Sequence, residues 1–289
     1  LLVFAATTLA RLPLPGCQSV TTAAGRAVIA CGRMLRILDL SNETLALTGT
    51  LEVSGPVEAV ALAPHGDTAY LSTYDTFYIV DLNGEAPRIQ ATETIRGGGR
   101  MAVAPDSRTG YLRLPNALAV FDVSTPSAPR RVATFEHAPG VDDVAFRPDG
   151  EVAVVVGRQR VLVFDTRVAT APELIAEASA PAASRARFSA DGEQVYLFGG
   201  RSFSVFDLSD PSAPTQRKVF EFEAGANSAL ARDERVLLAG SNGLLELDLR
   251  NPGRPALRGS VEGGEWWRQT GIALSSDGRH AFANANSAL

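Results

Sequence analysis

Charged and polar residues recur at a nearly constant interval along this chain, and they are the first candidates for a binding or catalytic site. Arg100, Asp143 and Arg185 are separated by 43 and 42 residues. A guanidinium suits carboxylate and phosphate ligands, whereas a carboxylate can act as a general base or a metal ligand. The candidate ligand- or partner-binding residues in and beside this series are Glu58, Arg100, Asp142, Asp143, Arg185 and Asn227.

A tryptophan-containing segment near the C-terminus is the second candidate. Trp266, Trp267 and Arg268 are consecutive, and the chain has only these two tryptophans. Trp and Arg are enriched at binding hot spots, so we expect at least one of the indoles to be exposed to a partner. In the alternative interpretation, one Trp packs inside the fold and seals it.

The two cysteines, Cys17 and Cys31, lie at equal distances from a turn near residues 24–25. An antiparallel pair of strands around that turn would place them opposite each other, where a disulfide can form. A disulfide would fit an oxidising compartment. Two free thiols that pack side by side are the alternative.

The sequence has no motif that identifies an enzyme. His65, His137 and His280 lack the short spacing of metal ligands. A phosphate-binding loop, a serine-nucleophile elbow and a zinc-peptidase motif are also missing from the sequence. We therefore expect no catalytic residue, no metal site and no cofactor, and a non-catalytic role is favoured.

The candidate residues belong to a repeat that determines the fold. A V-F-D-like segment recurs every 41 to 43 residues and ends at Asp39, Asp81, Asp122, Asp165, Asp207 and Asp248. One unit contains four strand-like segments, at 57–62, 68–72, 77–81 and 88–95. Four short strands in a unit of this length describe one blade of a β-propeller. The recurring Asp is interpreted as a turn residue whose carboxylate accepts backbone N–H bonds.

The number of blades follows from counting turns. The first hairpin turn of the unit occurs seven times, but the V-F-D segment only six. Residues 1–4 resemble the missing third strand, and residues 9–14 would hold the fourth. The sequence thus predicts an all-β, seven-bladed β-propeller with four-stranded antiparallel blades, one domain spanning residues 1–289. The ring would be closed by a blade to which the N- and C-termini contribute two strands each.

This arrangement would bring the candidate residues together. The first strand of each blade lines the central channel, which places Arg100, Asp143 and Arg185 at one level near its mouth. Polar groups that converge from different blades are what a ligand site requires. In the alternative interpretation, these charges pair only with one another and with water.

The repeat units resemble the LVIVD-repeat propellers of bacteria, which are related to the YVTN-type repeats. The resemblance rests on Ile79-Val80-Asp81-Leu82 and on the segments VFDVSTPSAP at 120–129 and VFDLSDPSAP at 205–214. It covers essentially the whole chain and implies a propeller fold. Proteins of this kind are mostly exported or cell-surface bacterial proteins, so the resemblance implies a periplasmic, cell-surface or secreted location. YVTN-type folds include lactonases.

Composition limits the range of partners. The formal net charge is −5, which argues against a nucleic-acid surface. No run of 18 uncharged apolar residues is present, so no transmembrane segment is expected. The chain begins at Leu1, and residues 1–6 would fit the end of a signal peptide, although the missing strand is the preferred interpretation.

Two functions remain open at this point. The leading hypothesis is a non-catalytic exported or cell-surface scaffold that recognises a protein, peptide or glycan at the mouth of its channel. The alternative is a lactonase-like or other hydrolase, in which Glu58, Asp142 or Asp143 serves as a base or metal ligand. In either case, the ring could be one domain of a larger surface protein.

Overall fold

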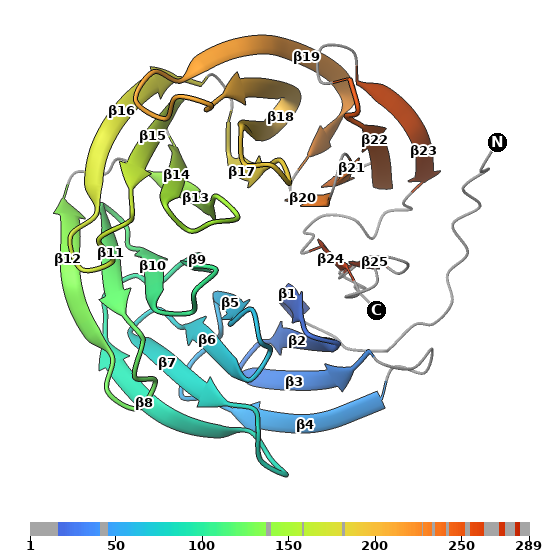
Figure 1. The fold of residues 1–289 in the computed structure, drawn as a ribbon. Coiled ribbons are helices and arrows are strands. Elements are labelled where there is room, and N and C mark those ends of the chain that lie inside the picture. Colours follow the sequence, from blue (N-terminus) through green and yellow to red (C-terminus); the bar gives the residue numbers. More distant parts are fainter. Residues whose placement is uncertain are drawn as a thin grey trace.

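The computed structural model describes residues 17–40, 46–136, 140–157, 159–180, 183–226, 228–232, 235–240, 243–251, 255–262, 272–274 and 281–283. These residues form antiparallel β-sheets arranged around one axis, as Figure 1 shows. Within these ranges, no helix has the length and apolar character that crossing a membrane requires. The predicted all-β propeller is therefore confirmed as a fold.

Each blade is an up-and-down sheet whose strands follow one another from the centre of the ring outward (Figure 1). The first blade contains β1 (Cys17–Ala23), β2 (Arg26–Cys31), β3 (Met34–Asp39) and β4 (Ala46–Glu52). The second contains β5 (Ala59–Leu62), β6 (Thr68–Ser72), β7 (Thr76–Asp81) and β8 (Arg88–Thr94). The third contains β9 (Met101–Val103), β10 (Thr109–Arg113), β11 (Ala117–Asp122) and β12 (Arg130–Glu136).

The next three blades repeat this pattern. The fourth contains β13 (Val141–Phe146), β14 (Val152–Gly157), β15 (Arg160–Asp165) and β16 (Glu173–Ser179). The fifth contains β17 (Arg185–Phe188), the long β18 (Gln194–Asp207) and β19 (Thr215–Ala226). The first half of β18 pairs with β17 and its second half with β19, so β18 supplies both middle strands. The sixth contains β20 (Ser228–Arg232), β21 (Arg235–Gly240), β22 (Gly243–Asp248) and β23 (Ala256–Glu262).

The prediction of seven four-stranded blades is wrong, because the described residues form six such blades. The last repeat contributes only β24 (Ile272–Leu274) and β25 (Ala281–Ala283), which make a two-stranded sheet. The predicted closure of the ring by a blade shared between the two termini is therefore also wrong. The sequence contains seven first-hairpin turns, but a hairpin makes only two of the four strands of a blade. The third and fourth strands expected at 1–4 and 9–14 lie outside the described residues. That residues 1–289 form a single domain stays a prediction.

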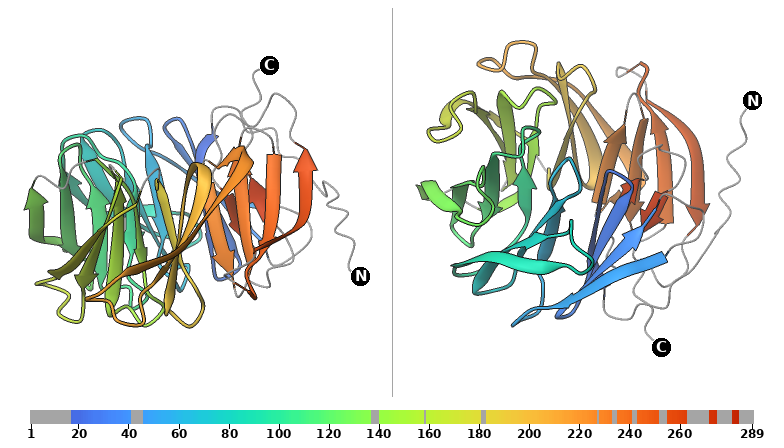
Figure 2. Two further views of the ribbon diagram at one scale, coloured as in Figure 1. Left: turned by 90° about the horizontal axis from the view of Figure 1, so that it is seen from above. Right: turned by 60° about the horizontal axis from the view of Figure 1, so that its bottom comes forward.

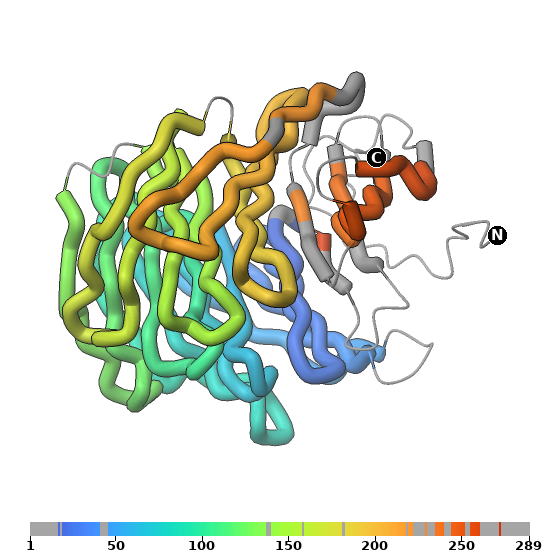
Figure 3. The backbone as a smooth tube through the Cα atoms, turned by 45° about the horizontal axis from the view of Figure 1, so that its top comes forward, coloured from blue at the N-terminus to red at the C-terminus, as the bar shows by residue number. Residues whose placement is uncertain are grey.

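The inner strands hold neighbouring blades together. Each inner strand contacts the next one around the ring from β1 to β20, and β24 contacts both β20 and β1. Seen from the side, the strands run between two faces of the ring (Figure 2). The chain passes up and down between these faces before it moves to the next blade (Figure 3). We call the face at which the inner strands begin the upper face and the opposite one the lower face.

The core consists of layers between blades. Along β14, Val152, Val154 and Val156 pack against the fifth blade. Ala153 and Val155 point the other way and pack against the third blade. Successive side chains of a strand point to opposite faces, so a middle strand with both faces buried reads as a continuous apolar run. Fully burying one such side chain contributes about 1.5–3 kcal/mol.

The recurring aspartates are turn residues, as the sequence predicted. Asp122 Oδ1 accepts the backbone N–H of Ser124 at 3.0 Å, and Asp207 Oδ1 accepts that of Ser209 at 2.9 Å. Asp81, Asp165 and Asp248 accept the backbone N–H two residues further on in the same way. A carboxylate that closes such a turn stabilises it locally.

The first hairpin turn of the second blade requires a glycine. Gly66 has a φ of +71°, which L-residues with a side chain rarely adopt. A Cβ at this position would also lie 2.9 Å from the carbonyl oxygen of Ala23 in the first blade. The turn therefore depends on glycine both for its own shape and for contact between the blades.

The two cysteines are joined. Cys17 and Cys31 are directly opposite in the pairing of β1 with β2, and they form a disulfide. Both residues are buried. The bond thus links the inner strand of the first blade to its second strand.

Candidate functional site

The structure places five of the predicted residues at the upper face. Glu58 directly precedes β5 and is exposed, and its backbone N–H donates to Ser72 O at 2.8 Å. Arg100 directly precedes β9 and is half-buried. Asp142 and Asp143 lie in β13, and Arg185 is the first residue of β17. Four further predicted residues lie outside the described ones, namely Asn227, Trp266, Trp267 and Arg268.

Asp143 links two blades. Its Oδ2 accepts Arg187 Nη1 at 2.7 Å and the backbone N–H of Ala186 at 3.2 Å, both from the fifth blade. The side chain of Asp143 is 8% exposed and that of Arg187 is 29% exposed. A charge-assisted hydrogen bond at this depth stabilises the contact between blades four and five. It also engages Oδ2, one of the two oxygens that Asp143 could use as a general base.

Arg100 and Arg185 have no such carboxylate partner. Neither forms an ion pair with any residue that the structure describes, although both are half-buried. Arg185 Nη1 donates to the carbonyl oxygen of Ser184 at 2.5 Å. Arg185 Nε is buried and has no acceptor among the described residues. A buried donor without an acceptor costs about 1–3 kcal/mol.

The electrostatic environment opposes both charges. Burial lowers the pKa of Arg100, and the nearby Arg187 and Arg113 lower it further, against the attraction of Asp143. Burial together with the charge of Arg100 lowers the pKa of Arg185 to about 10. Arg100 directly precedes β9 and Arg185 begins β17, and both of these inner strands contact β13, the strand that carries Asp142 and Asp143.

Two arginines of this region were missed by the sequence analysis. Arg187 follows Arg185 by two residues in β17, and Arg113 ends β10, where its N–H donates to Arg100 O at 2.9 Å. The hairpin register would have revealed Arg113. In the second blade, Ser72 stands opposite Ala59, the residue that aligns with Arg100, and Arg113 holds the equivalent position in the third blade. We call the set the arginine cluster; it comprises Arg100, Arg113, Asp142, Asp143, Arg185 and Arg187. Four guanidinium groups face two carboxylates in it, so positive charge is in excess.

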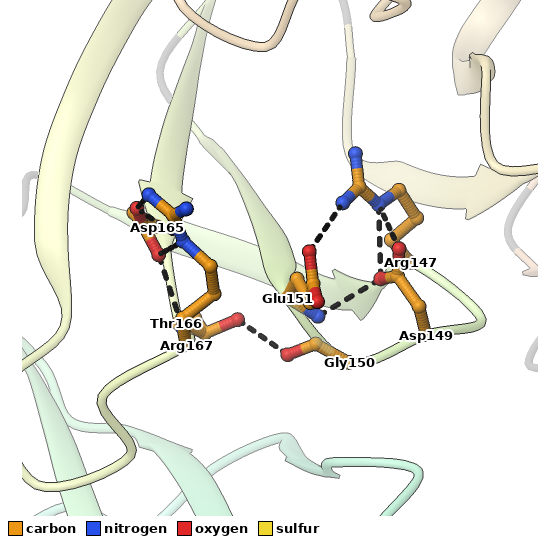
Figure 4. A network of polar contacts seen from close by, with 7 residues as sticks. All are labelled: Arg147, Asp149, Gly150, Glu151, Asp165, Thr166 and Arg167. Carbon is orange, nitrogen blue, oxygen red and sulfur yellow. Dashed lines mark hydrogen bonds and ion pairs between the residues drawn. The ribbon is translucent and has the colours of Figure 1, made fainter.

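The lower face carries arginines in a different setting, which Figure 4 shows for the fourth blade. Arg147 Nε lies 2.8 Å from Asp149 Oδ2, and its Nη2 lies 3.4 Å from Glu151 Oε2. Nearby, Arg167 forms an ion pair with the strand-end Asp165. Equivalent pairs occur in other blades, at Asp81–Arg88, Asp122–Arg130, Asp207–Arg217 and Asp248–Arg250.

These lower-face pairs lower the pKa of each aspartate. The hydroxyl and backbone N–H of Ser209 and the guanidinium of Arg217 bring the pKa of Asp207 to about 2. Hydrogen bonds from Arg250 and Arg258 hold the pKa of Asp248 far below its ordinary value. Each of these contacts favours the ionised carboxylate, so the repeated aspartates are structural anchors.

The lower face also has a cleft that could be a candidate site. This cleft of about 380 Å³ opens between the first two blades, lined among others by Arg26, Thr48, Glu85 and Pro87. The Arg26 guanidinium there is bound to the carbonyl oxygens of Gly66 and Leu82 at 3.0 and 2.9 Å. In the part of the chain that the structure describes, no three His, Cys, Asp or Glu side chains are grouped so that they could hold a metal ion.

Comparison with known proteins identifies the fold. No known protein family matches the sequence, and no curated protein matches it either. A functionally unknown protein from Desulfotomaculum acetoxidans DSM 771 superimposes with a TM-score of 0.78 at 15% identity, covering 96% of this chain and 92% of that chain. A chain of the mitotic checkpoint complex matches with a TM-score of 0.78 at 13% identity, covering 94% and 90%. The β-propeller domain of Cps50 (Swd1) from Myceliophteria thermophila matches with a TM-score of 0.74 at 12% identity, covering 94% and 98%. At these identities, the likeness shows a β-propeller fold.

Proposed function

We propose that this propeller is a non-catalytic binding protein that holds a protein, peptide or glycan partner against its upper face. The observation that carries the proposal is the pair of half-buried arginines, Arg100 and Arg185, neither of which forms an ion pair with a carboxylate of the described residues. Arg at a partly desolvated position is typical of a binding hot spot. Asp143 is already engaged by Arg187, which favours a binding role for the region over base catalysis.

Two further observations fit this proposal. One of the structures with the same fold is a chain of the mitotic checkpoint complex, so a ring of this shape takes part in a protein assembly there. The buried disulfide between Cys17 and Cys31 favours an oxidising compartment, hence a periplasmic, cell-surface or secreted location. The V-F-D units are the basis for including the protein among the bacterial LVIVD-type propellers, on its own or as one domain of a larger surface protein.

The proposal is tested by capturing partners with matched variants. Wild-type protein, Arg185→Gln and Arg217→Gln are immobilised and exposed to an envelope extract and to a glycan array. Arg217 lies on the lower face and pairs with Asp207, so its variant carries the same chemical change away from the upper face. We expect one partner to be held by wild type and by Arg217→Gln but lost by Arg185→Gln. Retention of every ligand by Arg185→Gln, or capture of none by wild type, would refute the proposal.

A further inference from the structure

The arginine cluster has a charge distribution that needs an explanation. A fold gains nothing from bringing Arg100 and Arg185, which repel each other, into one half-buried region. The two carboxylates of the cluster do not balance it. Asp143 is bound by Arg187 and by the backbone of Ala186, and Asp142 attracts Arg100 and Arg185 but forms no ion pair with either of them. The excess positive charge therefore remains with Arg100, Arg113 and Arg185.

The donors of Arg185 also lack acceptors. Its Nε is buried without a hydrogen bond to any described residue, while its Nη1 is turned toward the carbonyl oxygen of its own neighbour, Ser184. A guanidinium presents five N–H donors in a planar fork that matches the two oxygens of a carboxylate or phosphate. An oxyanion placed between the two arginines would accept these donors and reduce the repulsion between the guanidinium groups.

We propose that Arg100 and Arg185 form a clamp for an oxyanion, a carboxylate or phosphate group that the ligand presents to the upper face. This inference rests on the proposed function and adds the chemical group that the face selects. A cation is disfavoured at the same place, because positive charge is in excess there and one of the two carboxylate oxygens of Asp143 is already bound by Arg187. The nearby Arg113 adds to the field that attracts the anion.

The test titrates the protein with small anions, so that no partner needs to be known. Inorganic phosphate and citrate are used in separate calorimetric titrations at low ionic strength. Phosphate represents a phosphate group of the ligand, and citrate represents a carboxylate group. The variants are Arg100→Gln, Arg185→Gln and the control Arg160→Gln. Arg160 begins β15 on the same face and forms a 2.8 Å ion pair with Glu177, with its side chain 57% exposed.

We expect wild type to bind phosphate, citrate or both, with affinity that falls as NaCl is added. Arg100→Gln and Arg185→Gln should each weaken binding about tenfold or more, because each removes one charged fork. Arg160→Gln should change it by no more than roughly twofold, as expected for an exposed pair. Binding of phosphate alone or of citrate alone would identify the preferred oxyanion. Absence of binding of both anions, or equal affinities in all four proteins, would overturn the clamp.

A second measurement does not depend on the folding of the variants. Phenylglyoxal modifies arginines, and peptide mass mapping of the wild-type protein reports which of them react. The bound anion should protect Arg100 and Arg185 and leave the reaction of Arg160 unchanged; equal protection at all three would contradict the clamp. The two proposals also fail separately. If anions bind but Arg185→Gln does not affect partner capture, the clamp is supported and the proposed function is refuted. If Arg185→Gln abolishes partner capture but no anion binds, the proposed function is supported and the clamp is refuted.

Discussion

Arginines on the two faces of the ring are held in different ways. On the lower face, Arg88, Arg130 and Arg217 each contact a strand-end aspartate and keep most of their side chains exposed. On the upper face, Arg100 and Arg185 are half-buried and have no carboxylate partner among the described residues. The first arrangement recurs in five blades, so it belongs to the architecture. The second is found in blades three to five, where burial and neighbouring charges lower the pKa of both arginines, so it lacks the local stabilisation that the lower-face pairs provide.

The largest effect is expected at Asp143 on the upper face, which Arg187 binds. Asp143→Ala would leave Arg187 without its ion-pair partner and the N–H of Ala186 without its acceptor. Breaking a mostly buried pair of this kind should reduce the free energy of unfolding by about 3 kcal/mol. Urea denaturation of the variant and wild type measures the loss. Asp143→Asn is the matched variant, because it keeps an acceptor oxygen and should lose less; equal losses would show that an acceptor oxygen without the negative charge contributes nothing.

The next largest effect is the loss of stability that low pH should cause at the lower-face ion pairs. The pKa of Asp207 is about 2 in the folded protein and near 4 when unfolded, so its stabilisation is complete above pH 4 and is lost as the pH falls toward 2. Asp207→Asn should be less stable than wild type at pH 7, by less than Asp143→Ala. That difference should disappear between pH 4 and 2. Denaturant midpoints measured across this range decide the matter, and a difference that persists at pH 2 would mean that the charge of Asp207 is not its source.

Removing the charge of Arg185 should stabilise the protein, in contrast to the two variants above. At neutral pH the lowered pKa of Arg185 means that folding works against its charge, an effect that fades only as the pH rises past about 10. Arg185→Met keeps much of the aliphatic stem and should raise the thermal midpoint by about 2–4 °C in the unliganded protein. Calorimetric melting checks this. A lower midpoint would show that Arg185 supports the fold, as the lower-face arginines do.

The smallest effect is expected at an ordinary lower-face pair. The side chain of Arg130 is 73% exposed beside Asp122, and exposed pairs contribute about 0.2–1 kcal/mol. Arg130→Gln should therefore lower stability only within that range, and the difference should shrink in high salt. Urea melts with and without added NaCl provide the measurement. A loss as large as that of Asp143→Ala would erase the distinction between the faces.

The sequence alone predicted much of the fold, because the strands have a fixed period. The segments predicted at 68–72 and 77–81 correspond to β6 and β7, and the role of Asp122 in its turn was correct. The blade count was wrong because hairpins recur more often than complete blades. Period alone shows where a repeat begins, but not whether all four of its strands are present.

The candidate site was predictable only in part. Alignment of the first strands places Arg100, Asp143 and Arg185 at equivalent positions, and the structure brings their charges within reach of one another. The same alignment could not show that Arg187 captures Asp143, because that pairing depends on which way side chains of adjacent blades point. The alignment also considered only the first strand of each blade, so it excluded Arg113, which lies in the second strand of the third blade.

The alternation along the middle strands has a consequence for the ring as a whole. Val154 and Val155 are neighbours in β14, yet they belong to cores on opposite sides of the fourth blade. The cores on both sides of the fourth blade are therefore shared with its neighbours. If this blade were excised, it would expose two apolar surfaces that its own residues cannot cover. Loosening one blade uncovers half of each adjoining layer, so damage spreads to both neighbours and the ring should unfold cooperatively.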